Sequence, residues 1–180
     1  NLRRLQIGIG THLNPLDSFV SDGFKALKKL EDLKIDIVER FPGINHIFKA
    51  LVHLPLLSRF SFNIKFIKKH EWILFQDFLK SQTQLQLFAL EIEAQASCLS
   101  EYLEQNTCLE ALIKNLKNKP SLKDLTLKSS AWSLEALSNG LSHLTMNNQL
   151  HTFAFEASDD TVTSEEKAWK RVKGLCTFIK

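Results

Sequence analysis

The sequence is poor in the residues that build disulfide frameworks. Only three cysteines occur among 180 residues, Cys98, Cys108 and Cys176, and they form no short-range pair motif. An odd number of widely spaced cysteines argues against a disulfide scaffold. The sequence also lacks any Asn-X-Ser/Thr glycosylation acceptor. Both absences favour a reducing intracellular compartment, and we therefore expect a cytoplasmic protein.

Long apolar runs are missing as well. No stretch approaches the ~20 consecutive apolar residues of a membrane-spanning helix. No secretory signal opens the chain. The formal net charge is only +3, from 23 basic and 20 acidic residues. We therefore expect one soluble domain over residues 1–180 that has no membrane partner.

Motifs for catalysis and metal binding are absent too. The six histidines show no zinc-binding spacing such as His-Glu-X-X-His, and no cysteine lies in a recognisable nucleophile motif. Gly8-Ile9-Gly10 is only a fragment of a phosphate-loop pattern, and a turn that closes a strand explains it better. The sequence therefore predicts no enzyme, no cofactor, no metal site and no small-molecule substrate.

Six short segments share one pattern, in which an apolar residue is followed by two others, a second apolar residue, one spacer and a third apolar residue. These framed residues are Leu2, Leu5 and Ile7; Leu30, Leu33 and Ile35; Leu57, Phe60 and Phe62; Leu85, Phe88 and Leu90; Leu122, Leu125 and Leu127; and Leu150, Phe153 and Phe155. From first residue to first residue, the steps are 28, 27, 28, 37 and 28 residues. Such a period is typical of a solenoid whose units each contribute one strand and one helix.

A second pattern precedes the framed segments. Apolar residues recur 6, 10 and 13 positions before the segment starts, with Asp17 and Gly140 as exceptions. These offsets differ by three, four and seven residues, which marks one face of a helix. The residues at these offsets are Phe24, Leu51, Leu79, Leu116 and Leu144; Val20, Ile47, Phe75 and Leu112; and Ile44, Trp72, Leu109 and Leu137. The sequence therefore predicts that one helix precedes each strand from the second onward.

On these residues the chain resembles the ribonuclease-inhibitor-like class of leucine-rich repeat proteins, and the resemblance covers essentially the whole chain. It implies an α/β solenoid of about six repeats of ~28 residues, shaped as a horseshoe arc. Parallel strands stack about 4.8 Å apart whereas packed helices need about 8–10 Å, so the strands line the concave face and the helices the convex face. The chain departs from the class at the ninth repeat position, where an Asn or Cys is usual. That position holds Gly10, Val38, Lys65, Glu93, Ser130 and Ser158.

Two irregularities stand out in the array. Leu2 opens a strand with no preceding helix, and Phe178 lies 28 residues after Leu150. From these ends we expect the chain to be a window on a longer array. One repeat is longer by nine residues, and its extra residues fall within about 94–107. This insertion either emerges beside a face, where it can contact a partner, or merely extends the helix.

The residues between the buried positions of each strand point into the concavity, because side chains alternate between faces. Four cations and five anions leave these columns near neutral. They form either a ladder of solvated ion pairs, worth ~0–1 kcal/mol each, or a patterned face that selects a complementary protein. The residues that we predict to bind a partner are Arg4, Gln6, Asp32, Lys34, Asp36, Arg59, Ser61, Asn63, Leu87, Glu91, Asp124, Thr126, Lys128, Thr152 and Glu156.

Basic residues gather in the segments predicted as helices. They are Lys25, Lys28 and Lys29; Lys114, Lys117 and Lys119; and Lys167, Lys170, Arg171 and Lys173. These clusters can meet an acidic protein surface or a phosphate backbone, but no aromatic residues are clearly interleaved for base stacking. Solvated helix faces explain them better.

The resemblance therefore favours a non-catalytic protein–protein interaction scaffold, a subunit of a larger intracellular assembly. A regulatory or substrate-recognition adaptor is the alternative, because similar arrays occur in ubiquitin-ligase receptors and regulators of small GTPases. Nucleic-acid binding through the basic helices is a weaker alternative.

Overall fold

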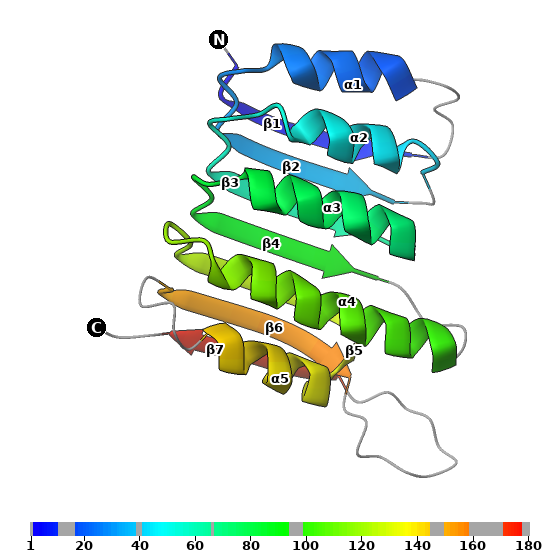
Figure 1. Cartoon of the computed structure of the whole chain (residues 1–180), viewed down its shortest axis with the longest axis vertical. Coiled ribbons are helices and arrows are strands. Elements are labelled where there is room, and N and C mark those ends of the chain that lie inside the picture. The colour runs from blue at the N-terminus through cyan, green and yellow to red at the C-terminus, as the bar shows by residue number, and fades with distance from the viewer. Residues whose placement is uncertain are drawn as a thin grey trace.

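Strands and helices alternate along the chain in a computed structural model that describes residues 2–10, 17–38, 41–65, 67–93, 99–144, 150–158 and 171–177. The strands are β1 (Arg4–Ile9), β2 (Asp32–Ile37), β3 (Arg59–Ile64), β4 (Leu87–Ile92), β5 (Asp124–Ser133), β6 (Thr152–Ser158) and β7 (Arg171–Thr177). The helices are α1 (Asp17–Ala26), α2 (Ile44–Leu51), α3 (Lys69–Ser81), α4 (Leu99–Lys117) and α5 (Leu134–Leu144). Each of the first five strands is followed by one helix (Figure 1).

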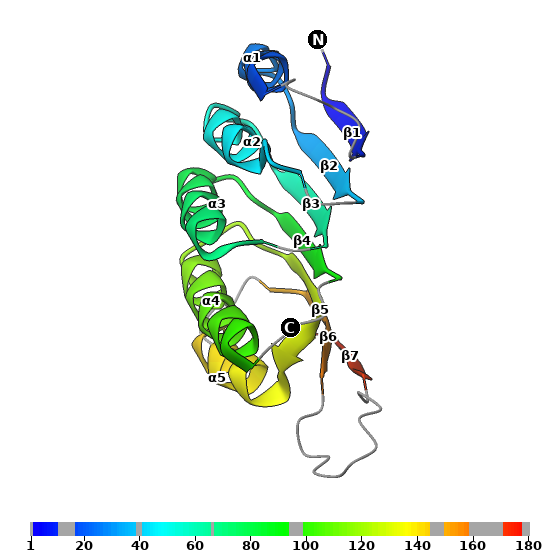
Figure 2. The same cartoon turned by 90° about the vertical axis from the view of Figure 1, so that its right-hand side faces the viewer.

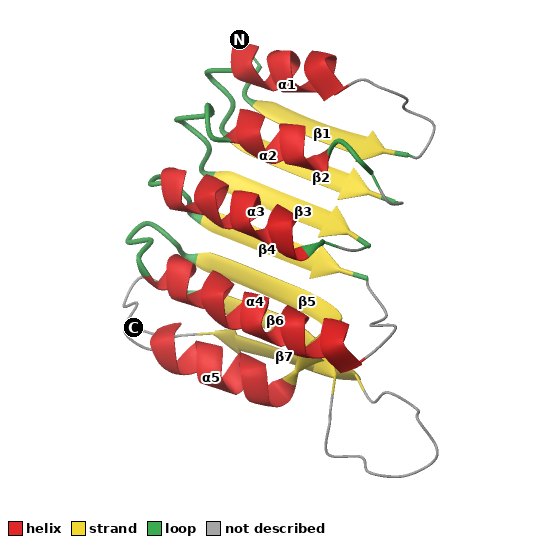
Figure 3. Ribbon diagram, turned by 45° about the vertical axis from the view of Figure 1, so that its right-hand side comes forward, coloured by secondary structure: helices red, strands yellow, loops and turns green. Residues whose placement is uncertain are grey.

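The strands form one open sheet in the order β1-β2-β3-β4-β5-β6-β7. Strands β1 to β6 are parallel, whereas β7 runs antiparallel to β6. Among the described residues, the five helices form a second layer on one face of the sheet, and no helix lies on the other face (Figures 2 and 3). The protein is therefore an α/β fold with a parallel sheet covered on one side, as the two alternating periodicities predict.

Strand register follows the framed residues. Each strand pair from β1 to β5 places equivalent framed positions directly opposite one another. Across the sheet, the middle framed residues form the row Leu5, Leu33, Phe60, Phe88, Leu125 and Phe153. The predicted register is confirmed, and it aligns the apolar side chains of all six parallel strands on the helix-covered face.

The amino ends of the strands are joined by a recurring hydrogen-bond pattern. At each junction, one carbonyl oxygen accepts two backbone N–H groups from the next unit, at 2.7–3.1 Å. These carbonyls belong to equivalent positions of five units: Arg3, Glu31, Ser58, Gln86 and Lys123. Because the same residue position makes the same bonds each time, the units are structurally equivalent at this edge.

Apolar side chains from strands and helices share one core between the two layers. The predicted inward helix positions are buried wherever the structure describes their side chains, from Phe24 to Leu144. An aromatic cluster occupies the middle of this core, where Phe75 of α3 lies 5.0–6.4 Å, between ring centroids, from six other rings. Those rings belong to Phe48, Phe60, Phe62, Trp72, Phe78 and Phe88.

Gly140 breaks the apolar pattern for a packing reason. A Cβ at this position would collide with the side chain of Ile113 in the neighbouring helix α4. Ile113 is itself fully buried, so its side chain fills the space that the missing Gly140 side chain leaves. The exception in the periodicity therefore marks a close contact between α4 and α5 rather than a break in the helix.

The long unit carries its extra residues mainly as helix. Helix α4 has 19 residues, against 13 in α3 and 8 in α2, and it begins at Leu99, within the predicted insertion. Residues 99–107 thus extend a helix, while residues 94–98 lie outside the described part. Of the two interpretations of the insertion, the described residues agree with the one in which it extends the helix.

The C-terminal part differs from the prediction. Arg171 and Lys173, expected on a helix, lie instead on β7, which pairs antiparallel with β6 along its full length. Thr177 lies opposite Thr152, so β7 takes the edge position where a seventh parallel strand would start. The position of Phe178, at which we expected a further repeat, lies outside the described residues.

Two buried polar side chains connect neighbouring helices. Gln82 follows α3 and donates through Nε2 to the carbonyl of Leu51, the last residue of α2, at 3.3 Å. Lys119 follows α4 and donates through Nζ to the carbonyl of Lys80, near the end of α3, at 3.1 Å. Both residues stand three positions before a framed leucine. Each satisfies a helix-end carbonyl that has no partner within its own helix.

The structure contradicts the prediction that Lys119 lies on a solvated helix face. Its residue surface is only 5% exposed. Burial lowers the pKa of its amine, because removal from water disfavours the charged form. The cluster of three lysines that we placed on the surface of this helix is therefore reduced to Lys114 and Lys117.

We expect Gln82→Ala to lower the free energy of unfolding by about 0.5–1.5 kcal/mol, because it removes a buried hydrogen bond to the Leu51 carbonyl, which then keeps only the bond from the Leu54 N–H. Gln84→Ala, two residues later at an exposed position, is the matched control and should change it by about 0.5 kcal/mol or less. Urea denaturation of both variants measures the difference. Equal effects would show that the bond between the units contributes nothing.

Candidate functional site

The face of the sheet that carries no helix is the candidate functional site. Alternate residues of each strand lie on it, because successive side chains point to opposite faces. In β4, for example, Phe88, Leu90 and Ile92 are buried, whereas Leu87, Ala89 and Glu91 are partly exposed. We call this surface the helix-free face. It includes all fifteen residues that the sequence predicts as partner contacts.

Strand pairing arranges these residues in three rows across the sheet. The rows consist of Arg4, Asp32, Arg59, Leu87, Asp124 and Thr152; of Gln6, Lys34, Ser61, Ala89, Thr126 and Ala154; and of Gly8, Asp36, Asn63, Glu91 and Lys128, with Glu156 opposite Lys128. The structure therefore brings all predicted contact residues onto one surface. Their role in binding remains a prediction.

Opposite charges on this face pair with one another. Arg59 Nε lies 3.4 Å from Asp32 Oδ2 on the neighbouring strand. Lys34 Nζ lies 3.4 Å from Asp36 Oδ2. These side chains are between 23% and 55% exposed, so solvent screens the pairs and each is worth only ~0–1 kcal/mol. The pairs contribute a charge pattern to the face more than stability.

A third pair completes the pattern toward β5. Lys128 Nζ lies 3.8 Å from Glu91 Oε2 on β4. Gln6 Nε2 also donates to Asp36 Oδ2 at 3.5 Å, which connects β1 to β2. Charges of both signs thus lie side by side on this face, both within β2 and between neighbouring strands.

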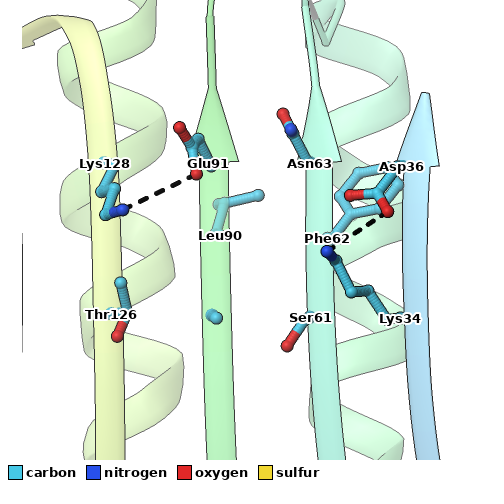
Figure 4. A pocket seen from close by; sticks show the side chains of 10 residues that line it. Lys34, Asp36, Ser61, Phe62, Asn63, Leu90, Glu91, Thr126 and Lys128 are labelled. Carbon is cyan, nitrogen blue, oxygen red and sulfur yellow. Dashed lines mark ion pairs between the residues drawn. The ribbon is translucent and has the colours of Figure 1, made fainter. Parts of the chain in front are cut away.

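A shallow depression of about 210 Å³ lies in the middle of the helix-free face (Figure 4). The Lys34–Asp36 ion pair stands on one side of it, and the Glu91–Lys128 pair stands on the other. Between these pairs, the depression is lined by shorter side chains from three strands: Ser61, Asn63, Ala89 and Thr126. We call this feature the central depression.

The short polar side chains of the central depression are available for binding. Ser61, Asn63 and Thr126 are each partly exposed. Among the described residues, these three side chains make no hydrogen bond to protein groups. Their hydroxyl and amide groups therefore offer donors and acceptors to a ligand at no cost in internal bonds.

Ala89 is the lining residue that sequence reasoning missed as a contact. It stands between Ser61 and Thr126 in the strand register. Both strand neighbours carry short side chains, whereas Lys34 beyond Ser61 is long. The sequence signal for the depression is the run of small residues in one row of the helix-free face. The depression itself forms only when the strands lie side by side in the sheet.

The basic helix segments do not form one surface. Lys25 pairs with Asp22 at 3.1 Å, and Lys119 is buried. Arg171 and Lys173 lie on β7, while Lys167 and Lys170 lie outside the described residues. Lys114 is exposed and Lys117 partly exposed on α4. Lys119, Arg171 and Lys173 therefore do not belong to the exposed helix surface on which the nucleic-acid alternative was based.

Within the described part of the chain, no three His, Cys, Asp or Glu side chains lie together in a way that could hold a metal ion. None of the helices described is both long and apolar enough to cross a membrane. No protein-family model matches this chain, and a comparison with curated proteins finds no significant match.

Proposed function

We propose that the chain is a leucine-rich repeat array of about six units of the ribonuclease-inhibitor-like class, and that its helix-free face binds a folded protein. The aligned framed residues and the recurring hydrogen bonds at the strand starts support the repeat interpretation. Helices packed on one face need more width than strands do, so such an array curves with its helix-free face on the concave side.

One observation carries the functional proposal. No described helix covers one face of the six parallel strands, and this face presents ion pairs, two of them between neighbouring strands, rather than an apolar surface. The occupant that fits this pattern is a protein surface that carries charges of both signs, because a partner of a single sign would meet like charges on several strands. Binding without catalysis, as a subunit of a larger intracellular assembly, is the function that we infer.

The partner is to be identified first, by crosslinking mass spectrometry on the native full-length protein. This experiment names a partner and a face together. Crosslinks from Lys34 or Lys128 support the helix-free face, whereas crosslinks confined to Lys114 and Lys117 place the partner on the helices. A ligase or GTPase component among the crosslinked proteins would assign the chain to the adaptor class instead.

We expect Arg59→Glu with Lys128→Glu to weaken binding of that partner by about tenfold or more, because a desolvated charge reversal costs well over 1 kcal/mol. Lys114→Glu with Lys117→Glu is the matched control and should mainly alter the association rate and its salt dependence. Isothermal titration calorimetry and interferometry measure both. Loss of binding in the helix variant alone would move the working surface to the helices.

A further inference from the structure

We propose that the central depression receives an uncharged carboxamide side chain, Asn or Gln, from the bound protein. This inference rests on the proposed function, because it assumes that a protein docks on the helix-free face. It adds the chemistry of the contact at the middle of that face, where interfaces concentrate their binding energy.

The size of the depression favours a side chain over a free small molecule. Its volume of about 210 Å³ is below the ~300–1,000 Å³ that small-molecule and cofactor sites occupy. It is partly open to solvent, so it does not enclose a ligand on all sides. A side chain that is held in place by the rest of a protein interface does not need such enclosure.

The charges around the depression favour a neutral group. Lys34 is already paired with Asp36, and Lys128 with Glu91. These four side chains carry two positive and two negative charges, so the walls have no net charge. A carboxylate or a guanidinium that enters between these pairs would lose part of its hydration and would find no unpaired charge of opposite sign. The desolvation of a neutral polar group costs much less free energy.

The hydrogen-bonding groups favour a carboxamide among neutral groups. Ser61 and Thr126 present hydroxyls that both donate and accept, and the Asn63 amide has two donors and one acceptor oxygen. They come from β3 and β5, on either side of β4. A carboxamide also carries both a donor and an acceptor, so it can bond to both strands at once. An aliphatic side chain would leave these groups desolvated and unpaired.

Ala89 provides the space for this group. It lies on β4 between Ser61 and Thr126, and its methyl is the smallest side chain that lines the depression. Ala89→Leu therefore fills the depression from below without changing a charge. Ala154→Leu, in the same row on β6 but outside the depression, is the matched control.

Three isosteric probes test the inference on the isotope-labelled chain by two-dimensional NMR: acetamide, acetate and acetamidinium. We expect acetamide to cause saturable shifts at the backbone amides of Ser61, Ala89 and Thr126, with a dissociation constant on the order of 10–100 mM. At matched ionic strength, the dissociation constants of the two charged probes should be at least about fivefold higher than that of acetamide. Ala89→Leu should abolish the shifts, whereas Ala154→Leu should keep them. The thermal melts of both variants should match that of the unsubstituted chain.

Tighter binding of acetate or acetamidinium, or the absence of saturable shifts with acetamide, would overturn the inference. The protein partner supplies the second readout. We expect Ala89→Leu to weaken its binding by about tenfold and Ala154→Leu to leave it nearly unchanged. If charge reversal weakens binding but Ala89→Leu does not, the proposed function stands and the carboxamide contact is wrong. If neither substitution weakens binding, both proposals fail.

Discussion

Leu125→Asp should lower the free energy of unfolding by at least about 3 kcal/mol, because it places an unpaired carboxylate in the core. Leu125 lies in the middle of β5, is 1% exposed, and stands in the row of framed residues that joins the strands. Leu125 belongs to the core of apolar side chains between the two layers. Thermal and urea denaturation of the full chain measure the loss.

Thr126→Ala is the matched control for this prediction. Thr126 is the next residue, is partly exposed on the helix-free face, and its side chain makes no hydrogen bond among the described residues. Its replacement should change the free energy of unfolding by about 0.5 kcal/mol or less. Equal losses for the two variants would contradict the alternation of faces in β5, and with it the placement of the candidate site.

Phe75→Ala should destabilise the protein by about 3–5 kcal/mol, because it removes a fully buried ring and leaves a cavity among rigid neighbours. Phe75 of α3 contacts rings of the neighbouring helix α2 and of strands β3 and β4, including Phe48 of α2 and Phe88 of β4. Its loss therefore weakens the contacts between three successive strand–helix units. We expect one cooperative unfolding transition at a lower midpoint, measured by circular dichroism.

Ile73→Ala provides the control on the same helix. Ile73 is 57% exposed on the outer side of α3, so truncation should change stability by about 0.5 kcal/mol or less. Alanine is also a better helix former than isoleucine, which offsets part of any loss. Should Phe75→Ala prove as mild as Ile73→Ala, the aromatic cluster would not be the centre of the core.

Most of the strand–helix order was predictable because each element buries its own apolar pattern. The framed residues of a strand lie within six residues, and the inward positions of a helix lie within eight. Local patterns of this kind are readable without knowledge of the neighbours. The register across strands followed as well, because a shift by one residue would expose the whole apolar set of a strand.

Long-range partners were not predictable in the same way. Lys119 was interpreted as a surface lysine because lysines are rarely buried. Its buried position becomes understandable from the structure, in which its amine donates to the Lys80 carbonyl of the neighbouring helix α3. Arg171 and Lys173 were expected in a helix, but residues 171–177 are a strand. They form β7 because the edge of β6 offers unpaired backbone groups, which is a property of the sheet and not of the segment.

The sequence by itself determined which residues face the core and which face solvent, since that choice follows from the period of the local pattern. It therefore specified the fifteen side chains of the helix-free face and the rows in which they stand. Only the tertiary structure decided which of those side chains form ion pairs and which of them line a depression. The ion pairs Asp32–Arg59 and Glu91–Lys128 and the central depression arise from strands that stack about 4.8 Å apart, which brings residues far apart in the sequence within contact distance.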